Sequence, residues 1–342
     1  MNAIVYTKYG PPEVLQLKDV AKPEPKEDQV LVKVRAASAN ALDYRRFEKI
    51  STVGRLMEER LTKSVGKVLG ADIAGVVEAV GASVKQFQPG DEVFGVAAGS
   101  KGGFAEYACA AEDHLALKPS NLSFEAAAAV PVTAVTALQG LRYKGGIHPG
   151  QKVLINGASG GVGTFAVQIA KSFGAEVTAV CSSRNLDIAR SIGADHVIDY
   201  TKEDFTKNGQ RYDLIFAVNG NQPLSAYQRV LNPQGIYICA GGAMPQILHA
   251  MLLGSLMSRK NGKKMGFMGI AKPNQKDLIY MAELLEAGKV APVIEKCYPL
   301  NEVPTVMRYL AEGHATGKVV LIVDHNHRIR QGPDQNQLGG DS

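Results

Sequence analysis

The stretch "LINGASGGVGTFAVQIAKSFGAEVTAVCSSRN", residues 154–185, decides the fold of this chain. An apolar run leads into a glycine-rich turn, then a helical pattern and a second apolar run, which is the β-α-β order of a dinucleotide-binding crossover. A phosphate-binding P-loop needs a lysine after its last glycine, but Thr164 follows Gly163, so that motif is excluded. The stretch therefore predicts a turn that holds a dinucleotide at the start of a helix.

The turn matches the pattern G-x-G-x-x-G imperfectly, because Ala158 stands at the first glycine. Glycines in such turns allow a tight bend, a close approach of the backbone to the diphosphate, and close packing of the helix on the strand. The flanking strands and helix at the expected spacing make the match specific, while a sharp turn without a ligand is the alternative. The residues predicted to contact the cofactor here are Ala158, Ser159, Gly160, Gly161, Val162 and Gly163.

The end of the second strand indicates which dinucleotide is bound. NAD-binding chains usually carry an acid there, but this strand runs into Ser182, Ser183 and Arg184. Hydroxyls and a planar guanidinium suit the extra phosphate of NADP, which an acid would repel. Tyr200, after the next strand, could add another hydroxyl. With no acid expected nearby, we predict NADPH as the cofactor; for Arg184 alone, a solvated cation at a helix start is the alternative.

The rest of the chain divides around this crossover. Residues 1–122 hold short β-type runs between Pro and Gly signals, which predicts a small, partly open β-barrel. Residues 123–269 begin with an alanine-rich helix, capped by Ser123 and broken at Pro131, and then alternate strands and helices as in a doubly wound parallel sheet. Residues 270–324 hold an amphipathic helix ended by Gly288 and a final strand that could rejoin the first domain, and residues 325–342 read as a disordered tail. The predicted fold class is α/β.

Composition narrows the partners and the compartment. A chain of 342 residues suits two domains, and its net charge of +5 is spread without the Lys/Arg blocks of a nucleic-acid binder. No apolar run reaches the roughly 20 residues of a membrane span, and the first residues do not resemble a secretion signal. The 4 cysteines lack metal-binding spacing. We expect a cytoplasmic protein that binds small molecules.

Several motifs in order resemble the medium-chain dehydrogenase/reductase superfamily, in its zinc-independent quinone oxidoreductase-like (zeta-crystallin-like) branch. They include "YGPPEVLQL", "LGADIAGVVEAVG", "PVTAVTALQGL" and "HATGKVVL", and the resemblance covers roughly residues 1–324. It implies a GroES-like catalytic domain built from both chain ends, with a Rossmann-type cofactor domain between them. The zinc-ligand positions of the alcohol dehydrogenase branch match Asn40, the pair Ala71 and Asp72, and Val132, a set that cannot hold zinc. We therefore expect no metal.

Without a Lewis acid, such a site must activate its acceptor by orientation and hydrogen bonds. This suits quinones and α,β-unsaturated carbonyls, which already stabilise the incoming charge. The resemblance points to Asn40 for orienting a ribose or substrate oxygen, to Asp43 for ordering its neighbours, and to Tyr44 as a hydrogen-bond or proton donor. The alternative is that Tyr44 packs in the cleft and Asp43 caps a helix turn.

Further cofactor contacts follow from the same resemblance. Thr133 matches a position that touches the nicotinamide carboxamide, although a helix-cap role is the alternative. Lys318 could approach a phosphate or pair with a carboxylate. Core packing is the alternative for Phe267 and Met268. The remaining predicted contacts are Asn219, Gly241, Gly242, Phe267 and Met268.

The predicted function is an NADPH-dependent, zinc-independent oxidoreductase that transfers hydride to quinones or α,β-unsaturated carbonyls. The alternative is an NADPH-binding regulatory or scaffold protein with little turnover. Residues 47–66 are expected to form a flap over the substrate cleft. By analogy we expect a homodimer, or a tetramer, in which "GIYICAGG", taken as the last strand of the cofactor domain, pairs across a twofold axis.

Overall fold

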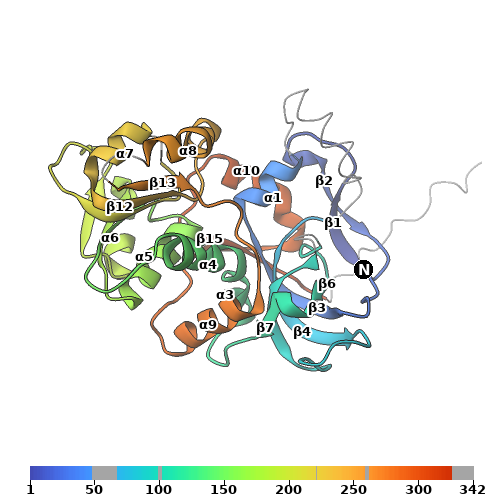
Figure 1. Ribbon diagram of the computed structural model, residues 1–342. Coiled ribbons are helices and arrows are strands. Elements are labelled where there is room, and N and C mark those ends of the chain that lie inside the picture. The colour runs from blue at the N-terminus through green and yellow to red at the C-terminus, as the bar shows by residue number, and fades with distance from the viewer. Residues whose placement is uncertain (48–67, 99–101, 221, 259–261, 326–342) are drawn as a thin grey trace, which may run out of the picture.

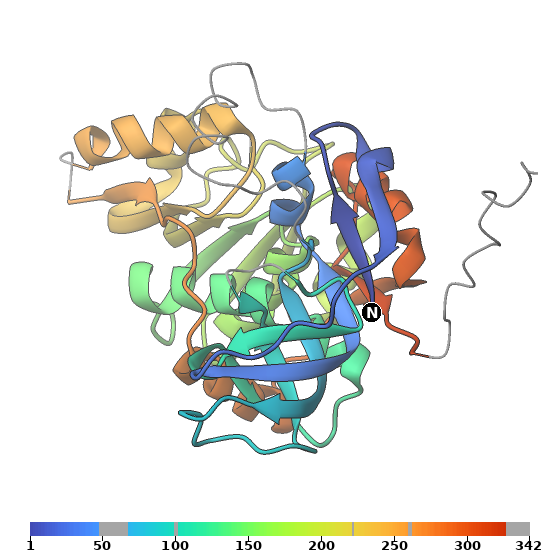
Figure 2. The ribbon, with the colours of Figure 1, turned by 90° about the vertical axis from the view of Figure 1, so that its right-hand side faces the viewer.

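Two sheets organise the molecule, and three helices lie between them. The computed structural model describes residues 1–47, 68–98, 102–220, 222–258 and 262–325. In Figure 1 the parallel sheet and its helices lie on the left and the β-rich part on the right. Figure 2, turned by 90°, shows the β-rich part from its own side. Helices α3 (Phe124–Ala128), α4 (Pro131–Leu138) and α9 (Gln275–Glu286) fill the middle.

The parallel sheet has the strand order β10-β9-β8-β11-β12-β13. Its strands are β8 (Lys152–Asn156), β9 (Glu176–Cys181), β10 (His196–Asp199), β11 (Tyr212–Ala217), β12 (Leu231–Cys239) and β13 (Lys264–Phe267), and every pairing is parallel. This is the order 3-2-1-4-5-6 of dinucleotide-binding folds, in which ligands bind where the order reverses. The predicted Rossmann-type sheet is confirmed.

The helices of this part follow from local sequence signals. Ser123 Oγ accepts a hydrogen bond from the Ala126 N–H at 3.2 Å and so caps α3, and Pro131 starts α4 as a separate helix. Helix α9 is followed by Gly288, whose φ of 65° ends it as predicted. The helices on the faces of the sheet are α5 (Gly161–Ser172), α6 (Leu186–Ser191), α7 (Leu224–Val230) and α8 (Met244–Met257).

The β-rich part contains strands from both ends of the chain. Its main sheet has the order β14-β15-β3-β4-β5-β7, β6 also pairs with β3, and β1 pairs with β2. The late strand β15 runs antiparallel to β3, with Val319 opposite Ala39, so the C-terminal segment rejoins the first domain. The strands are β1 (Asn2–Tyr6), β2 (Leu15–Asp19), β3 (Gln29–Ala39), β4 (Asp72–Val80), β5 (Glu92–Val96), β6 (Tyr107–Ala111), β7 (Leu115–Leu117), β14 (Ile294–Pro299) and β15 (Lys318–Ile322). Helices α1 (Ala41–Phe47) and α10 (Val303–Ala311) complete this part.

One of the hydrophobic clusters of the molecule contains residues from both parts. It joins Phe94 of β5, Leu138 of α4 and Phe165 of α5, all fully buried. Since this cluster is continuous through the middle helices, the two sheets hold each other in place. The carboxyl ends of the parallel strands therefore lie at a fixed position relative to β3, β4 and β15.

One prediction about the sheet is wrong. The strand that contains "GIYICAGG" is β12, and β13 pairs along its outer side from Ile236–Lys264 to Cys239–Phe267. The last strand is therefore β13, so a dimer cannot form by pairing β12 strands. The expected flap lies outside the described residues except for Phe47, and so does the tail except for His325, whose Nε2 lies 2.7 Å from the Val34 carbonyl oxygen. Among the described helices, none has the length and apolar character that crossing a membrane requires.

Candidate cofactor-binding and active site

The glycine turn has the geometry of a dinucleotide-binding crossover. Gly157 has a φ of 87°, so the left-handed residue of the turn comes one position before the predicted first glycine. A Cβ on Gly163 would lie 2.0 Å from the Gly157 carbonyl oxygen, so only glycine lets α5 pack this closely on the turn. A Cβ on Gly160 would meet only that same oxygen, at 3.8 Å. The backbone at Gly160 is thus open to an approaching diphosphate.

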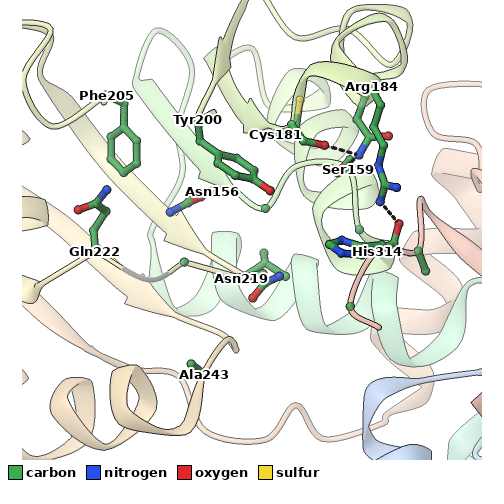
Figure 3. A pocket seen from close by; sticks show the side chains of 18 of the residues that line it. Asn156, Ser159, Cys181, Arg184, Tyr200, Phe205, Asn219, Gln222, Ala243 and His314 are labelled. Atoms are coloured by element: carbon green, nitrogen blue, oxygen red, sulfur yellow. Dashed lines mark hydrogen bonds between the residues drawn. The ribbon is translucent and has the colours of Figure 1, made fainter. Parts of the chain in front are cut away.

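A cavity of about 520 Å³ opens at this turn, at the carboxyl ends of the parallel strands (Figure 3). Of the predicted cofactor residues, it is lined by Ser159, Gly160, Ser182, Arg184, Tyr200 and Asn219. Residues that the sequence reasoning missed also line it, among them Asn156, Gly157, Asn185, Phe205, Gln222 and His314. The cavity has room and polar groups for the adenosine half of a dinucleotide.

The C-terminal segment closes one side of this cavity. The Arg184 guanidinium donates a hydrogen bond to the His314 carbonyl oxygen, and the Gly317 N–H donates to the Ser159 carbonyl oxygen at 2.7 Å. Asn185 links the two segments, because its Nδ2 lies 3.0 Å from Ser159 Oγ and its Oδ1 accepts from Thr316 Oγ1 at 3.0 Å. In Figure 3 the Tyr200 hydroxyl and the His314 imidazole turn toward the middle of the cavity. In the sequence, the family motif "HATGKVVL", which begins at His314, was the indication that this C-terminal segment belongs to the site.

The expectation that no acid lies near the end of β9 is wrong. Ser183 Oγ donates to Asp199 Oδ2 at 2.5 Å, and Asp199 ends the neighbouring strand β10. Hydrogen bonds from Ser183 and then Thr201 lower the pKa of Asp199 to about 2, so this carboxylate is charged at neutral pH. Glu203 and Asp204 also line the cavity. The rim therefore holds carboxylates as well as the Arg184 cation.

The three candidate catalytic residues lie where β3 turns into α1. Asp43 is buried and its Oδ2 accepts from the Asn40 N–H at 2.9 Å, so the alternative that it caps a helix turn is confirmed. The Asn40 amide binds protein groups at both ends: Nδ2 donates to Asp72 Oδ2 at 2.9 Å, and Oδ1 accepts from Lys318 Nζ at 2.7 Å. Tyr44 is half-buried and packs against the core of the β-rich part. Their catalytic roles stay predictions.

Lys318 pairs with a carboxylate rather than reaching toward the cavity described above. Its Nζ lies 3.3 Å from Asp72 Oδ2, and both side chains are at most 2% exposed. Its stem packs beside the glycine turn, because a Cβ built on Gly161 would lie 3.0 Å from Lys318 Cδ and 3.1 Å from Thr133 Cγ2. Thr133 Oγ1 donates to the Ala129 carbonyl oxygen at 3.0 Å, which leaves its methyl group facing the turn.

The other predicted cofactor residues support the turn or the strand ends. Ala158 is fully buried, and Val162 and Met268 are half-buried against the core. A Cβ on Gly241 would lie 2.7 Å from the Val218 carbonyl oxygen, and Gly242 has a φ of 109°. Phe267 ends β13 and packs against the core beneath α7 and α8.

The positions that match the zinc ligands of the alcohol dehydrogenase branch come together in space. Asp72 Oδ1 accepts from the Val132 N–H at 2.9 Å, and Asp72 Oδ2 accepts from Asn40 Nδ2. In the part of the chain that the structure describes, no group of three or more His, Cys, Asp or Glu side chains is placed to hold a metal ion. The Lys318 ammonium belongs to this cluster and is hydrogen-bonded to Asn40 and Asp72.

Comparisons with known proteins agree with this architecture. Residues 26–120 match the alcohol dehydrogenase GroES-like domain, and residues 192–321 match a family described as zinc-binding dehydrogenase. The chain is 38% identical over 334 residues to 2-methylene-furan-3-one reductase of Solanum lycopersicum, covering 94% of this chain and 79% of the relative. It is 35% identical, with the same coverage, to the chloroplastic NADPH-dependent alkenal/one oxidoreductase of Arabidopsis thaliana.

The structural comparison gives the same result. The quinone oxidoreductase from Coxiella burnetii matches with a TM-score of 0.83 and 29% identity, covering 95% of this chain and 99% of that one. The two-domain fold, the glycine turn and the cavity beside it define a nicotinamide-dependent oxidoreductase. The chain belongs to the medium-chain dehydrogenase/reductase superfamily, in its zinc-independent quinone oxidoreductase-like branch.

Proposed function

We propose that this protein is an NADPH-dependent reductase of quinones or α,β-unsaturated carbonyl compounds. The observation that carries the proposal is the cavity at the glycine turn, with an open backbone at Gly160 and the Arg184 guanidinium at its rim. The bound cofactor would supply the hydride. The protein would bind and orient both reactants.

The residues at the adenosine end fit NADPH. Arg184 uses part of its guanidinium for the His314 carbonyl oxygen, and its other N–H groups remain for a phosphate. Ser182, Tyr200 and His314 line the same cavity and add polar groups beside it. The carboxylates of the rim oppose a phosphate, but the hydrogen bonds from Ser183 and Thr201 already occupy Asp199. The balance favours NADPH over NADH.

The acceptor class is supported by the relatives and by the chemistry of the site. The named relatives act on a methylene-furanone and on alkenals and enones, and a matched structure is that of a quinone oxidoreductase. Such acceptors stabilise the charge that hydride addition creates and need only hydrogen bonding and orientation. Tyr44 on α1 is the proposed hydrogen-bond donor to the acceptor oxygen, and the capping bond from Asn40 to Asp43 fixes the start of that helix.

The test is a steady-state screen that follows NADPH oxidation with a panel of quinones, 2-alkenals and enones. We expect turnover with at least one of these classes, and NADPH to be preferred over NADH by at least about tenfold in kcat/KM. Equal use of NADH would reject the proposal that Arg184 binds the extra phosphate of NADPH. Tight NADPH binding without turnover of any acceptor would instead favour the regulatory or scaffold alternative.

A homodimer also belongs to this proposal. The edge strand β13 lies beside α8, whose outer face exposes Met251, Leu252 and Leu256 by 56%, 69% and 61%. Exposed apolar side chains in this number are typical of a contact surface. Light scattering on the purified protein would give twice the chain mass of 36.5 kDa, and a monomer would reject the proposal. The cytoplasmic location stays a prediction.

A further inference from the structure

A cluster of buried, hydrogen-bonded polar side chains lies outside the adenosine cavity. Asp72, the first residue of β4, is fully buried, and its two carboxylate oxygens bind four groups from three segments: the end of β3, the start of α4 and β15. Oδ1 accepts from the Val132 N–H at 2.9 Å. Oδ2 accepts from Ser38 Oγ at 2.7 Å, from Asn40 Nδ2 at 2.9 Å and from Lys318 Nζ at 3.3 Å.

Lys318 completes this cluster with a buried cation. Its Nζ donates to Asn40 Oδ1 at 2.7 Å and to the Ala39 carbonyl oxygen at 3.2 Å in addition to Asp72. These contacts occupy the hydrogen-bonding directions of the ammonium, so the lysine is held rather than free to move. They also fix the Asn40 amide in one orientation, because its oxygen faces the cation and its nitrogen faces the anion.

The cluster ties the β-rich part to the cofactor domain. Val132 lies in the first turn of α4, next to Thr133, whose methyl group faces Gly161 of the glycine turn. The stem of Lys318 lies beside the same glycine. A shift of Asp72 would therefore move the start of α4 and the Asn40 amide together. The sequence predicts that Asn40 orients a ribose or substrate oxygen and that Thr133 contacts the nicotinamide half of the cofactor, so the cluster would set the positions of both.

A buried ion pair gains little stability over apolar side chains of the same size, so stability alone does not account for this pair. We propose that Asp72 and Lys318 are positioning residues for hydride transfer: they hold Asn40 and Thr133 at the nicotinamide end of the cleft. This inference rests on the proposed function. It assigns neither residue a contact with the reacting atoms.

The test compares Asp72→Asn with Asp213→Asn as a matched control. Asp213 also accepts from a backbone N–H, that of Lys152 at 2.9 Å, but it lies at the opposite end of the parallel sheet. For Asp72→Asn we expect kcat per folded protein to fall by about ten- to a hundredfold, since misplacement by about 1 Å has an effect of this size. The Kd of 2′,5′-ADP, which probes only the adenosine end, should stay within about twofold.

A spectroscopic readout separates positioning from stability. The fluorescence of bound NADPH reports the surroundings of the nicotinamide, so its enhancement should be reduced in Asp72→Asn and unchanged in Asp213→Asn. A purely structural role would lower the unfolding midpoint of Asp72→Asn while kcat and the bound-cofactor emission of the folded protein stayed at wild-type values. That result would overturn the proposal.

A second variant guards against misfolding. Asp72→Asn leaves the Lys318 ammonium buried without its anion, whereas the double variant with Lys318→Met removes both charges together. We expect the double variant to show the same loss of kcat; a wild-type kcat would overturn the proposal, and failure of both variants to fold would assign the pair to stability alone. Wild-type protein that binds no NADPH would reject the proposed function itself. Wild-type turnover with unaffected variants would reject only the positioning role.

Discussion

Two glycines of one turn should respond in opposite ways to the same substitution. Gly163→Ala puts a methyl group 2.0 Å from the Gly157 carbonyl oxygen and 2.8 Å from two further backbone atoms of Ala158. An ordinary contact needs about 3.4 Å, so the turn or α5 must move by more than about 1 Å. Overpacking of this kind costs about 1–3 kcal/mol, and here backbone rather than a flexible side chain must give way. We expect a loss of about 3 kcal/mol in the free energy of unfolding.

Gly160→Ala should leave stability intact and weaken the cofactor. Gly160 has φ −80° and ψ 174°, which alanine adopts without strain, and the added methyl group would meet only one protein atom, at 3.8 Å. The free energy of unfolding should be unchanged or higher by about 0.4–1 kcal/mol, because alanine restricts the unfolded chain. The methyl group would occupy the space in front of the turn. Loss of one charge-assisted hydrogen bond to a phosphate, about 1.5–3 kcal/mol, corresponds to an increase of about 10- to 150-fold in the Kd of NADPH.

Two assays read out this pair of variants. Denaturant unfolding of the protein without cofactor gives the free energy of unfolding. A titration that follows the change in NADPH fluorescence on binding gives the Kd of NADPH. The reasoning is refuted if Gly160→Ala binds NADPH as tightly as the wild type, since the diphosphate would then not approach this backbone. It is also refuted if Gly163→Ala unfolds at the wild-type denaturant concentration. The turn would then accommodate a methyl group that the structure places 2.0 Å from the Gly157 carbonyl oxygen.

Three further predictions concern the rim of the cavity. Arg184→Gln should raise the KM for NADPH by about 10- to 100-fold and leave that for NADH within about twofold, measured by steady-state kinetics. Ser183→Ala should raise the pKa of Asp199 from about 2 toward its usual value. In the wild type, the stability from this carboxylate is present above an unfolded-state pKa of about 4 and is lost as the pH falls toward 2. The variant should lack much of this stability at neutral pH and should approach the wild type as the pH falls toward 2, as unfolding measured across this pH range would show. Burial raises the pKa of Cys181 to about 11 and also raises the pKa of Cys297, but Cys181 is buried and Cys297 is exposed. A maleimide should therefore modify Cys297 and leave Cys181 intact, as peptide mass spectrometry would show.

The parallel sheet was predictable where the signals are local. Strands β8 and β9 form where the sequence predicts the two apolar runs of the crossover, because both strands are buried on each face and end at turn residues. The cap at Ser123 and the break at Pro131 depend only on neighbouring residues. The position of β13 was not predictable in this way. It has four residues, "KMGF", with no alternation or apolar run, and it becomes a strand only because β12 offers it an edge.

Only some of the residues that line the adenosine cavity could be predicted, because the others reach it through contacts between distant parts of the chain. Ser159, Ser182 and Arg184 follow strands of the crossover and are read along the chain. His314 and Asn185 belong to the site through the contact between the C-terminal segment and the turn, which joins residues more than a hundred positions apart. No pattern within one element encodes such a contact. Only the motif order of the family indicated that the segment mattered.

The acid beside Ser183 shows where a rule read along one strand fails. The rule inspects the end of β9, but in a parallel sheet the neighbouring strand ends at the same level, and Asp199 is the register partner of Cys181. A carboxylate is therefore present beside the adenosine end after all. Its oxygens already accept from the hydroxyls of Ser183 and Thr201, so it can offer little to a ribose hydroxyl. The proposed preference for NADPH therefore depends on two groups: a carboxylate that already accepts hydrogen bonds from the protein, and the Arg184 guanidinium, which bonds the His314 carbonyl oxygen with one of its N–H groups. We expect the guanidinium to outweigh the carboxylate and to favour the phosphate.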